Sequence, residues 1–124
     1  NLDMIDKTQK SYHKLIIWQK FKDLLLETYK LTDKLPKSED FNLKSQMRRA
    51  IVSVISNFFE GYLKKSQKDK ARFLGIAETS LLELEGQGEI CLILKYWTIK
   101  DYAQFDKVRS LAGYFLSRYK AKIL

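Results

Sequence analysis

The chain is poor in the residues that turn or cross-link a polypeptide. Its 124 residues include one cysteine, one histidine, one proline and five glycines. Because Cys91 stands alone, no internal disulfide can form, and the scaffold typical of small secreted domains is excluded. So few glycines and prolines leave little material for the tight turns that join strands, which favours helices over sheets. A chain of this length is expected to form one domain with one core.

The same scarcity limits the chemistry that the chain can perform. With only His13 and Cys91, one chain cannot assemble a histidine–cysteine zinc site, and a catalytic triad would depend entirely on His13 near one end. We therefore expect no enzyme and no cofactor. The sequence has no apolar run of about 18 residues, so no membrane-spanning helix is expected. Its N-terminus lacks the layout of a signal peptide, so the cytoplasm is the expected location.

What the sequence does contain is apolar residues three and four positions apart, the spacing of amphipathic helices. A first helix is predicted over 15–35. It ends at Pro36, because proline removes a backbone donor and disfavours helical geometry at the residue before it. A second helix starts after Asn42, a potential cap, and ends between Gly61 and Lys65.

Two further helices follow, each preceded by a hydroxyl residue that can cap it. Ser66 stands three residues before Asp69, and Thr98 three residues before Asp101, so each helix has a cap and an acid in its first turn. The connections are only a few residues long, and neighbouring helices must therefore be antiparallel. The predicted fold is all-α, an antiparallel up-and-down four-helix bundle.

The bundle is predicted over 15–124, and the weaker periodicity of 1–14 indicates an N-terminal arm, possibly flexible. The apolar stripes of the first two helices are broader than one core requires. The surplus residues are Ile16, Trp18, Leu26, Ile55, Phe59 and Leu63. A helix with apolar residues on more than one side meets either the bundle core or another subunit, so self-association is predicted. Ordinary scatter of apolar residues on the surface is the alternative.

The charge balance favours a polyanionic partner. Lys and Arg number 23 against 15 Asp and Glu, a formal net charge of +8. This excess favours nucleic acid first and an anionic membrane surface second, and of the two we predict nucleic acid as the partner and no membrane. Lysine-rich helix surfaces also serve simply to keep proteins in solution, so the charge alone does not decide.

The positive residues concentrate in two clusters. The first joins the second and third helices and consists of Lys64, Lys65, Lys68, Lys70 and Arg72. The second lies in the last helix and consists of Lys107, Arg109, Arg118, Lys120 and Lys122. Such patches bind phosphates through counterion release with little sequence selectivity. Aromatic rings close by in the sequence are candidates for stacking on unpaired bases, or else belong to the core: Tyr62, Phe73 and Tyr119.

Acidic residues gather in the third helix, at Glu78, Glu83, Glu85 and Glu89. Carboxylates on one helix face can in principle bind a divalent metal. Pairing with a neighbouring helix or subunit is the stronger interpretation, since Arg48 and Arg49 of the antiparallel second helix lie at about the right height. We therefore predict no metal site.

Four residues are unusual inside helices. Gly75, Gly86 and Gly88 each cost about 1 kcal/mol relative to alanine in a helix interior, and close approach of a neighbouring helix is the predicted compensation. Asn57 stands in the apolar stretch of the second helix. A polar side chain there is expected to fix the register of the bundle or to bond across an interface.

A longer motif runs through the second helix. Within that helix it comprises Gln46-Met47-Arg48-Arg49-Ala50, Ser56-Asn57 and Glu60-Gly61. Two shorter segments precede it, Trp18-Gln19-Lys20 and Leu35-Pro36. Two others follow it, Phe73-Leu74-Gly75 and Ser80-Leu81-Leu82-Glu83. With this series, which spans most of the chain, the sequence resembles a four-helix bundle family. The family includes the proteins encoded within 23S rRNA intervening sequences and the accessory variability determinants of diversity-generating retroelements. Phe58-Phe59 and Thr79 depart from the family pattern.

The resemblance implies a homopentameric ring of bundles with a basic surface or central channel. For the retroelement branch it also implies binding to RNA or DNA and to a reverse transcriptase that performs mutagenic cDNA synthesis. For the intervening-sequence branch it implies a structural or interaction protein of undefined role, without such a partner. Motif matching does not separate the two branches.

By position, Arg48 and Arg49 are the arginines of the family motif. Two roles are open for them: contact with nucleic acid, or pairing with the glutamates of the third helix to hold subunits together. Because adjacent helical residues point about 100° apart, we predict that one arginine has the first role and the other the second. The net charge and the family resemblance together favour a non-catalytic accessory protein of the retroelement type that binds nucleic acid, and an intervening-sequence protein without a reverse transcriptase is the alternative. Its predicted contact residues are Arg48, Arg49, Lys64, Lys65, Lys68, Lys70 and Arg72.

Overall fold

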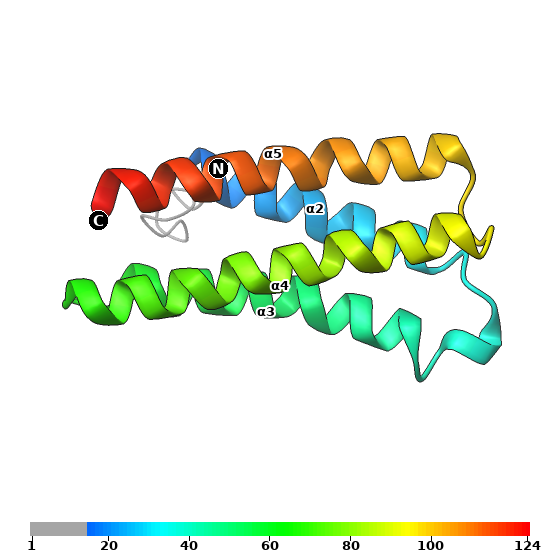
Figure 1. Ribbon diagram of the computed structural model, residues 1–124, viewed down its shortest axis with the longest axis horizontal. Coiled ribbons are helices and arrows are strands. Elements are labelled where there is room, and N and C mark those ends of the chain that lie inside the picture. The colour runs from blue at the N-terminus through cyan, green and yellow to red at the C-terminus, as the bar shows by residue number, and fades with distance from the viewer. Residues whose placement is uncertain (1–14) are drawn as a thin grey trace, which may run out of the picture.

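The computed structural model describes residues 15–124. Over this part of the chain it contains four α-helices, α2 (Ile16–Thr32), α3 (Leu43–Leu63), α4 (Gln67–Ile93) and α5 (Ile99–Ile123), and a short 3-10 helix, η2 (Lys37–Glu39). The helices lie side by side in alternating directions (Figure 1). The predicted all-α fold with four helices is confirmed for the described residues, and the arm predicted over 1–14 lies outside them.

The helices form a closed circuit in which each packs on two others. α2 contacts α3 and α5, and α4 contacts the same two helices from the opposite side. Because the directions alternate, one end of the bundle gathers the beginnings of α2 and α4 and the ends of α3 and α5 (Figure 1). Segments far apart in the sequence therefore share that end.

All four helices contribute to the core. Side chains with no more than 1% of their surface exposed include Phe21, Leu24, Met47, Ile51, Val54, Phe58, Leu74, Leu84, Phe105 and Leu116. Each fully buried side chain of this size stabilises the fold by about 1.5–3 kcal/mol relative to its exposed state. The rings of Phe21 and Phe58 meet edge to face at 5.1 Å, which joins α2 to α3. The apolar spacing in the sequence accounts for this core.

Both hydroxyl caps predicted for the last two helices are present. The backbone amide of Asp69 donates to Ser66 Oγ at 3.1 Å. The amide of Asp101 donates to Thr98 Oγ1 at 3.0 Å, and the Thr98 amide donates back to Asp101 Oδ2 at 3.1 Å. These bonds satisfy amides that a helix leaves free at its start, so α4 and α5 begin where the sequence predicts.

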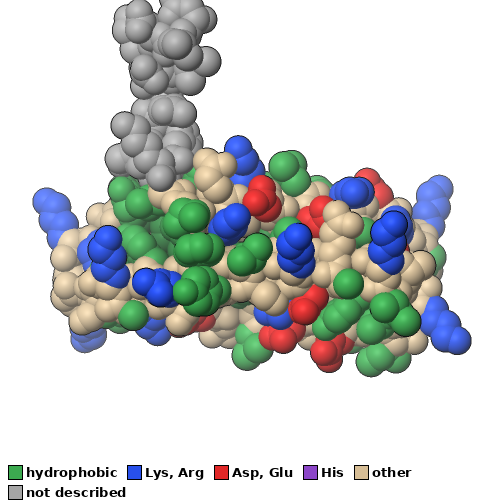
Figure 2. Space-filling model, turned by 90° about the horizontal axis from the view of Figure 1, so that it is seen from above, with side chains coloured by type: hydrophobic (Ala, Val, Ile, Leu, Met, Phe, Trp, Pro, Cys, Tyr) green, Lys and Arg blue, Asp and Glu red, His purple; other side chains and the backbone are tan. Residues whose placement is uncertain are grey.

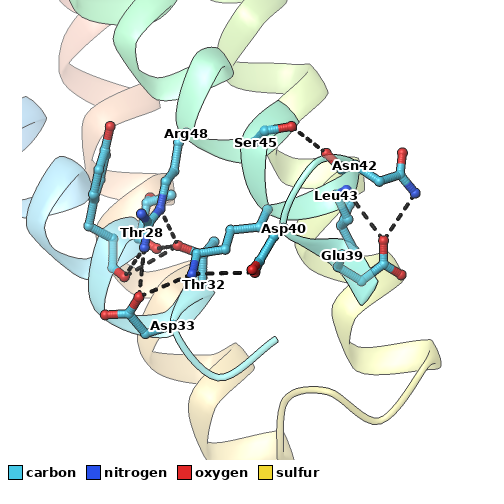
Figure 3. Close-up of polar contacts among 11 residues, drawn as sticks. Thr28, Thr32, Asp33, Glu39, Asp40, Asn42, Leu43, Ser45 and Arg48 are labelled. Atoms are coloured by element: carbon cyan, nitrogen blue, oxygen red, sulfur yellow. Dashed lines mark hydrogen bonds and ion pairs between the residues drawn. The ribbon is translucent and has the colours of Figure 1, made fainter. Parts of the chain in front are cut away.

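The cap predicted at Asn42 is wrong in its chemistry, although α3 begins directly after that residue. The Asn42 backbone has φ −131° and ψ −102°, and its side chain accepts no hydrogen bond from the first amides of α3. Instead Glu39 Oε1 accepts from the Leu43 amide at 3.4 Å and from Asn42 Nδ2 at 3.0 Å (Figure 3). The carboxylate of η2 therefore caps α3 in place of the asparagine.

Part of the predicted apolar surplus is used inside the chain. The rings of Trp18 and Phe59 pack edge to face at 5.4 Å between α2 and α3, and Ile55 packs against the core. Leu26 and Leu63 remain exposed. The width of the stripes on the first two helices thus serves intrachain packing as well as any outer contact.

Close helix approach explains only one of the three glycines within α4. A Cβ atom added at Gly88 would lie 2.5 Å from Phe105 Cε2, so α5 needs the space that this glycine leaves. At Gly75 and Gly86 nothing lies within 4 Å of an added Cβ. The predicted compensation is confirmed for Gly88 and is wrong within the chain for the other two, because they face outward.

Candidate nucleic-acid interface

The fold brings most of the two predicted basic clusters to one end of the bundle. The rings of Tyr62 in α3 and Tyr119 in α5 lie 6.4 Å apart, and Lys120 Nζ is 2.8 Å from Glu78 Oε1 in α4. The end of α5 therefore lies beside the α3–α4 junction. We call this region the basic end, and it comprises Lys64, Lys65, Lys68, Lys70, Arg72, Arg118, Lys120 and Lys122. Lys107 and Arg109 lie further along α5.

The surface at this end exposes its cations. In Figure 2, which views the molecule from the side of α5, Lys and Arg side chains stand out at both ends, and the acidic side chains lie mainly in the middle and toward the right, away from the left end. Lys65, Lys68 and Lys122 are exposed and form no ion pair with the described residues. Their charges are therefore available to a partner.

Three other predicted contact residues at the basic end already have partners within the chain. Lys70 Nζ donates to the carbonyl oxygens of Gly61 at 3.3 Å and Tyr62 at 3.1 Å, which satisfies the end of α3. Lys64 pairs with Glu60 at 3.8 Å. The guanidinium of Arg72 lies 4.3 Å from the centre of the Phe73 ring, although the side chain is still exposed.

The aromatic rings predicted to stack on bases are occupied by other side chains. Tyr119 packs against Phe58 at 5.3 Å and against Tyr62, and burial raises the pKa of its hydroxyl. Phe73 lies beneath Arg72. The sequence interpretation missed Tyr114, which is 54% exposed and whose hydroxyl accepts from Arg118 Nη1 at 3.1 Å. The sequence signal for this contact was the four-residue spacing between Tyr114 and Arg118, which places two side chains on the same side of a helix.

Arg48 of α3 is held against the end of α2 (Figure 3). Its Nε donates to Thr32 Oγ1 at 3.0 Å, and Nη2 donates to the Tyr29 carbonyl at 3.2 Å and to Asp33 Oδ1 at 2.9 Å. The guanidinium also lies 4.4 Å from the centre of the Tyr29 ring. The hydrogen bond from Arg48 lowers the pKa of the Asp33 carboxyl. Every one of these contacts joins α3 to α2.

Arg49 points elsewhere. Its side chain is exposed and makes no hydrogen bond or ion pair within the described part of the chain. It lies fifteen residues before Lys64, about 22 Å along α3 at about 1.5 Å per residue. The structure therefore gives the two motif arginines different surroundings and places neither beside the basic end.

Pairing of these arginines with the glutamates of α4 is wrong within one chain. Glu78 pairs with Lys120, Glu85 pairs with Arg109 at 3.6 Å, and Glu89 accepts a hydrogen bond from Tyr102 at 3.4 Å. The reason is the direction of the side chains, because these three face α5, whereas Arg48 faces α2. No group of three or more metal-ligating side chains occurs among residues 15–124. None of the helices described here is long and apolar enough to cross a membrane.

Comparison with known proteins bears on this arrangement. The sequence model of the 23S rRNA-intervening sequence proteins matches residues 13–112, which include all of α2, α3 and α4. The chain belongs to this family. The resemblance to intervening-sequence proteins is thereby confirmed, and the link to retroelement accessory proteins stays a prediction.

A solved structure shows the same fold. It is a protein of unknown function from the S23 ribosomal protein family of Bacteroides thetaiotaomicron VPI-5482, with a TM-score of 0.77 and 20% sequence identity, and the match covers 85% of this chain and 98% of that chain. At this identity the likeness concerns the fold alone. No curated protein matches the chain significantly.

In this member of the 23S rRNA-intervening sequence protein family, several motif residues hold α3 against α4. Ser53 Oγ and Ser80 Oγ share a hydrogen bond of 2.7 Å, and Asn57 Nδ2 donates to the Ser53 carbonyl at 2.8 Å. A Cβ atom at Gly61 would lie 3.2 Å from Leu74. Asn57 thus bonds within α3, to the serine that contacts α4, and the two roles predicted for it stay predictions.

Proposed function

We propose that this chain is a non-catalytic protein that binds RNA or DNA through the phosphate backbone. The supporting observation is the convergence of exposed cations from two helices at the basic end. Lys65, Lys68, Arg72, Arg118 and Lys122 are exposed there, and none forms an ion pair with a described carboxylate. Phosphate contacts need only positive charge at suitable spacing, so binding is salt-dependent and little affected by sequence.

Among the predicted contact residues, those whose nitrogen donors are free make the direct contacts to phosphate. Lys65, Lys68 and Arg72 contact phosphates at the basic end, and Arg49 forms a separate contact on the outer side of α3. Lys64 and Lys70 add positive potential, while the nitrogen atom of Lys64 pairs with Glu60 and that of Lys70 binds carbonyl oxygens at the end of α3. Arg48 has a positioning role, because its guanidinium already binds α2.

Salt-dependent binding tests this proposal. Fluorescence anisotropy with a labelled RNA hairpin and a DNA duplex would be measured over a range of salt concentrations. We expect each of Lys65→Ala and Lys68→Ala to weaken binding to both probes and to reduce the salt slope by about one. Lys37→Ala and Lys95→Ala, exposed lysines at the opposite end of the bundle, are matched controls and leave the slope unchanged. Absence of binding at low salt refutes the proposal.

We also propose, from the family resemblance, that the protein acts in the cytoplasm as a homopentameric ring beside a reverse transcriptase in a diversity-generating retroelement. There it would support mutagenic cDNA synthesis. A gene for a reverse transcriptase next to the coding sequence, with a pair of template and variable repeats, supports this partner. A coding sequence inside a 23S rRNA gene favours a structural role without it. A monomeric mass in light scattering at micromolar concentration rejects the ring.

A further inference from the structure

Helix α4 carries two rows of residues with the same spacing. The inner row faces the core and is buried: Leu74, Ala77, Leu81, Leu84, Gly88 and Cys91. The outer row follows steps of three and four residues along the opposite side: Gly75, Thr79, Leu82, Gly86, Ile90 and Ile93. Three of its members expose much of their apolar surface, Leu82 67%, Ile90 44% and Ile93 73%. A helix with two such rows is suited to pack on both sides.

The glycines of the outer row have no explanation inside the chain. An added Cβ at Gly75 or Gly86 meets no atom within 4 Å, whereas at Gly88 on the inner row it collides with Phe105. Glycine in a helix interior is less favourable than alanine by about 1 kcal/mol, so these positions lower the stability of an isolated subunit. Their backbone is open to close approach from outside.

Helix α5 has an outer row that fits this surface. Three small residues stand seven apart on it, Ala103, Ser110 and Ser117, and all are exposed. Beside them is a groove of about 540 Å³ lined by Lys100, Ala103, Gln104, Lys107 and Val108. Lys107 forms no ion pair with the described residues, and Glu83 of α4 is exposed and bonded only to Gln87 of its own helix. Glu83 on the row of α4 and Lys107 on the row of α5 are therefore opposite charges that can pair between two copies.

We infer that the outer row of α4 in one copy packs antiparallel against the outer row of α5 in a second copy. In the register where Gly86 faces Ala103, the Tyr114 ring lies over Gly75, Thr79 faces Ser110, and Glu83 lies beside Lys107. This inference rests on the self-association proposed above and assigns its surface.

The directions of the helices agree with such a contact. α4 and α5 are antiparallel within one subunit, so copies related by rotation about an axis along the bundle present them to each other antiparallel. The contact is heterologous, because two different surfaces meet, and repetition of it closes a ring or continues as a filament. In a ring the basic ends of all copies lie on one rim. Arg72 and Arg118 of neighbouring copies approach there, and a bound polyanion offsets their repulsion.

A steric test uses Gly86→Leu. The added side chain has room in the subunit, so helix content by circular dichroism stays unchanged, but it prevents close approach of α5 from another copy. We expect the apparent dissociation constant of the assembly to rise about tenfold or more in sedimentation or light-scattering measurements. Lys22→Leu, which adds the same side chain to the exposed surface of α2, is the matched control and keeps the wild-type mass.

A charge exchange tests the register. Glu83→Lys and Lys107→Glu each place like charges side by side and weaken association, and the double variant restores it. A monomeric wild type overturns both the self-association and this surface. An assembled wild type that Gly86→Leu and the single charge variants leave unchanged overturns the surface while self-association stands. Loss of assembly in each single variant without rescue in the double variant overturns the register.

Discussion

Two glycines that stand two residues apart in α4 should respond to alanine in opposite ways. At Gly88 the new Cβ would lie 2.5 Å from Phe105 Cε2 and 3.0 Å from Cδ2. Phe105 is only 1% exposed, and its ring packs against Trp97 at 4.9 Å, so it has little room to withdraw. At Gly86 the new methyl group meets nothing within 4 Å.

The magnitudes follow from two opposing effects. Alanine is more favourable than glycine in a helix interior by about 0.5–1 kcal/mol, and both variants gain this. Overpacking of a filled core costs about 1–3 kcal/mol, and only Gly88→Ala incurs it. We therefore expect Gly86→Ala to raise the free energy of unfolding by about 0.5–1 kcal/mol and Gly88→Ala to lower it by up to about 2.5 kcal/mol.

Urea and thermal unfolding followed by far-UV circular dichroism measure both changes. The wild type and the two variants are compared at a protein concentration where light scattering gives all three the same mass, so that association contributes equally. A difference of about 1 kcal/mol corresponds to roughly 4 °C in Tm for a domain of this size. If Gly88→Ala proves as stable as Gly86→Ala, the close contact between α4 and α5 does not exist in the form described.

Three further predictions concern single side chains. Arg48→Ala should lower the free energy of unfolding by about 1–2 kcal/mol because it leaves the end of α2 without its donors, whereas Arg49→Ala should change it by less than about 0.5 kcal/mol in urea unfolding. The carboxyls of Asp33 and Asp101 have lowered pKa values in the fold, because Arg48 and Lys34 donate hydrogen bonds to them. Their stabilisation is therefore present above about pH 4 and is lost as the pH falls further, and Asp101→Asn should flatten the dependence of Tm on pH in this range. Burial raises the pKa of the Cys91 thiol to about 12, so a thiol reagent at pH 8 should modify it only at the rate of unfolding.

The fold could be predicted because several sequence signals agree. Apolar spacing located the helices, and the hydroxyl caps at Ser66 and Thr98 located the start of two of them. The end of the first helix was predicted too late. α2 stops at Thr32, and Leu35 lies outside the helix although it is buried. An apolar residue at helical spacing can reach the core from a turn, so spacing alone does not fix a helix end.

The site was harder to predict, because helical spacing says how far apart two side chains point but not what each meets. Arg48 and Arg49 were expected to differ, yet only the position of the end of α2 shows that Arg48 is the one held. The partners of Glu78 and Glu85 likewise depend on which side of α4 faces α5. Net charge also gave no means of telling Lys70, which binds carbonyl oxygens, from Lys65, which is free.

The surplus apolar residues were also visible in the sequence, but the sequence did not show which of them are covered within the chain. The wide stripes of the first two helices were apparent in the sequence, but Trp18 and Phe59 cover each other in the fold. The outer row of α4 gave a weak signal, because glycine and threonine interrupt its aliphatic residues. Only the structure shows that Gly86 faces open space while Gly88 faces a ring.

The basic end and the outer rows of α4 and α5 are the two surfaces inferred for this protein, and they lie at right angles to each other. The basic end is set by the direction of the helices, since it gathers the beginnings of α2 and α4 and the ends of α3 and α5. The outer rows of α4 and α5 run along the sides of the bundle. In the assembly proposed above, every basic end would be left uncovered, and the phosphate contacts available to one long nucleic acid would multiply, which would raise its avidity without any new contact in the subunit. Lateral packing and phosphate binding would then support each other, because each copy held in the proposed ring would add free lysines to the same rim.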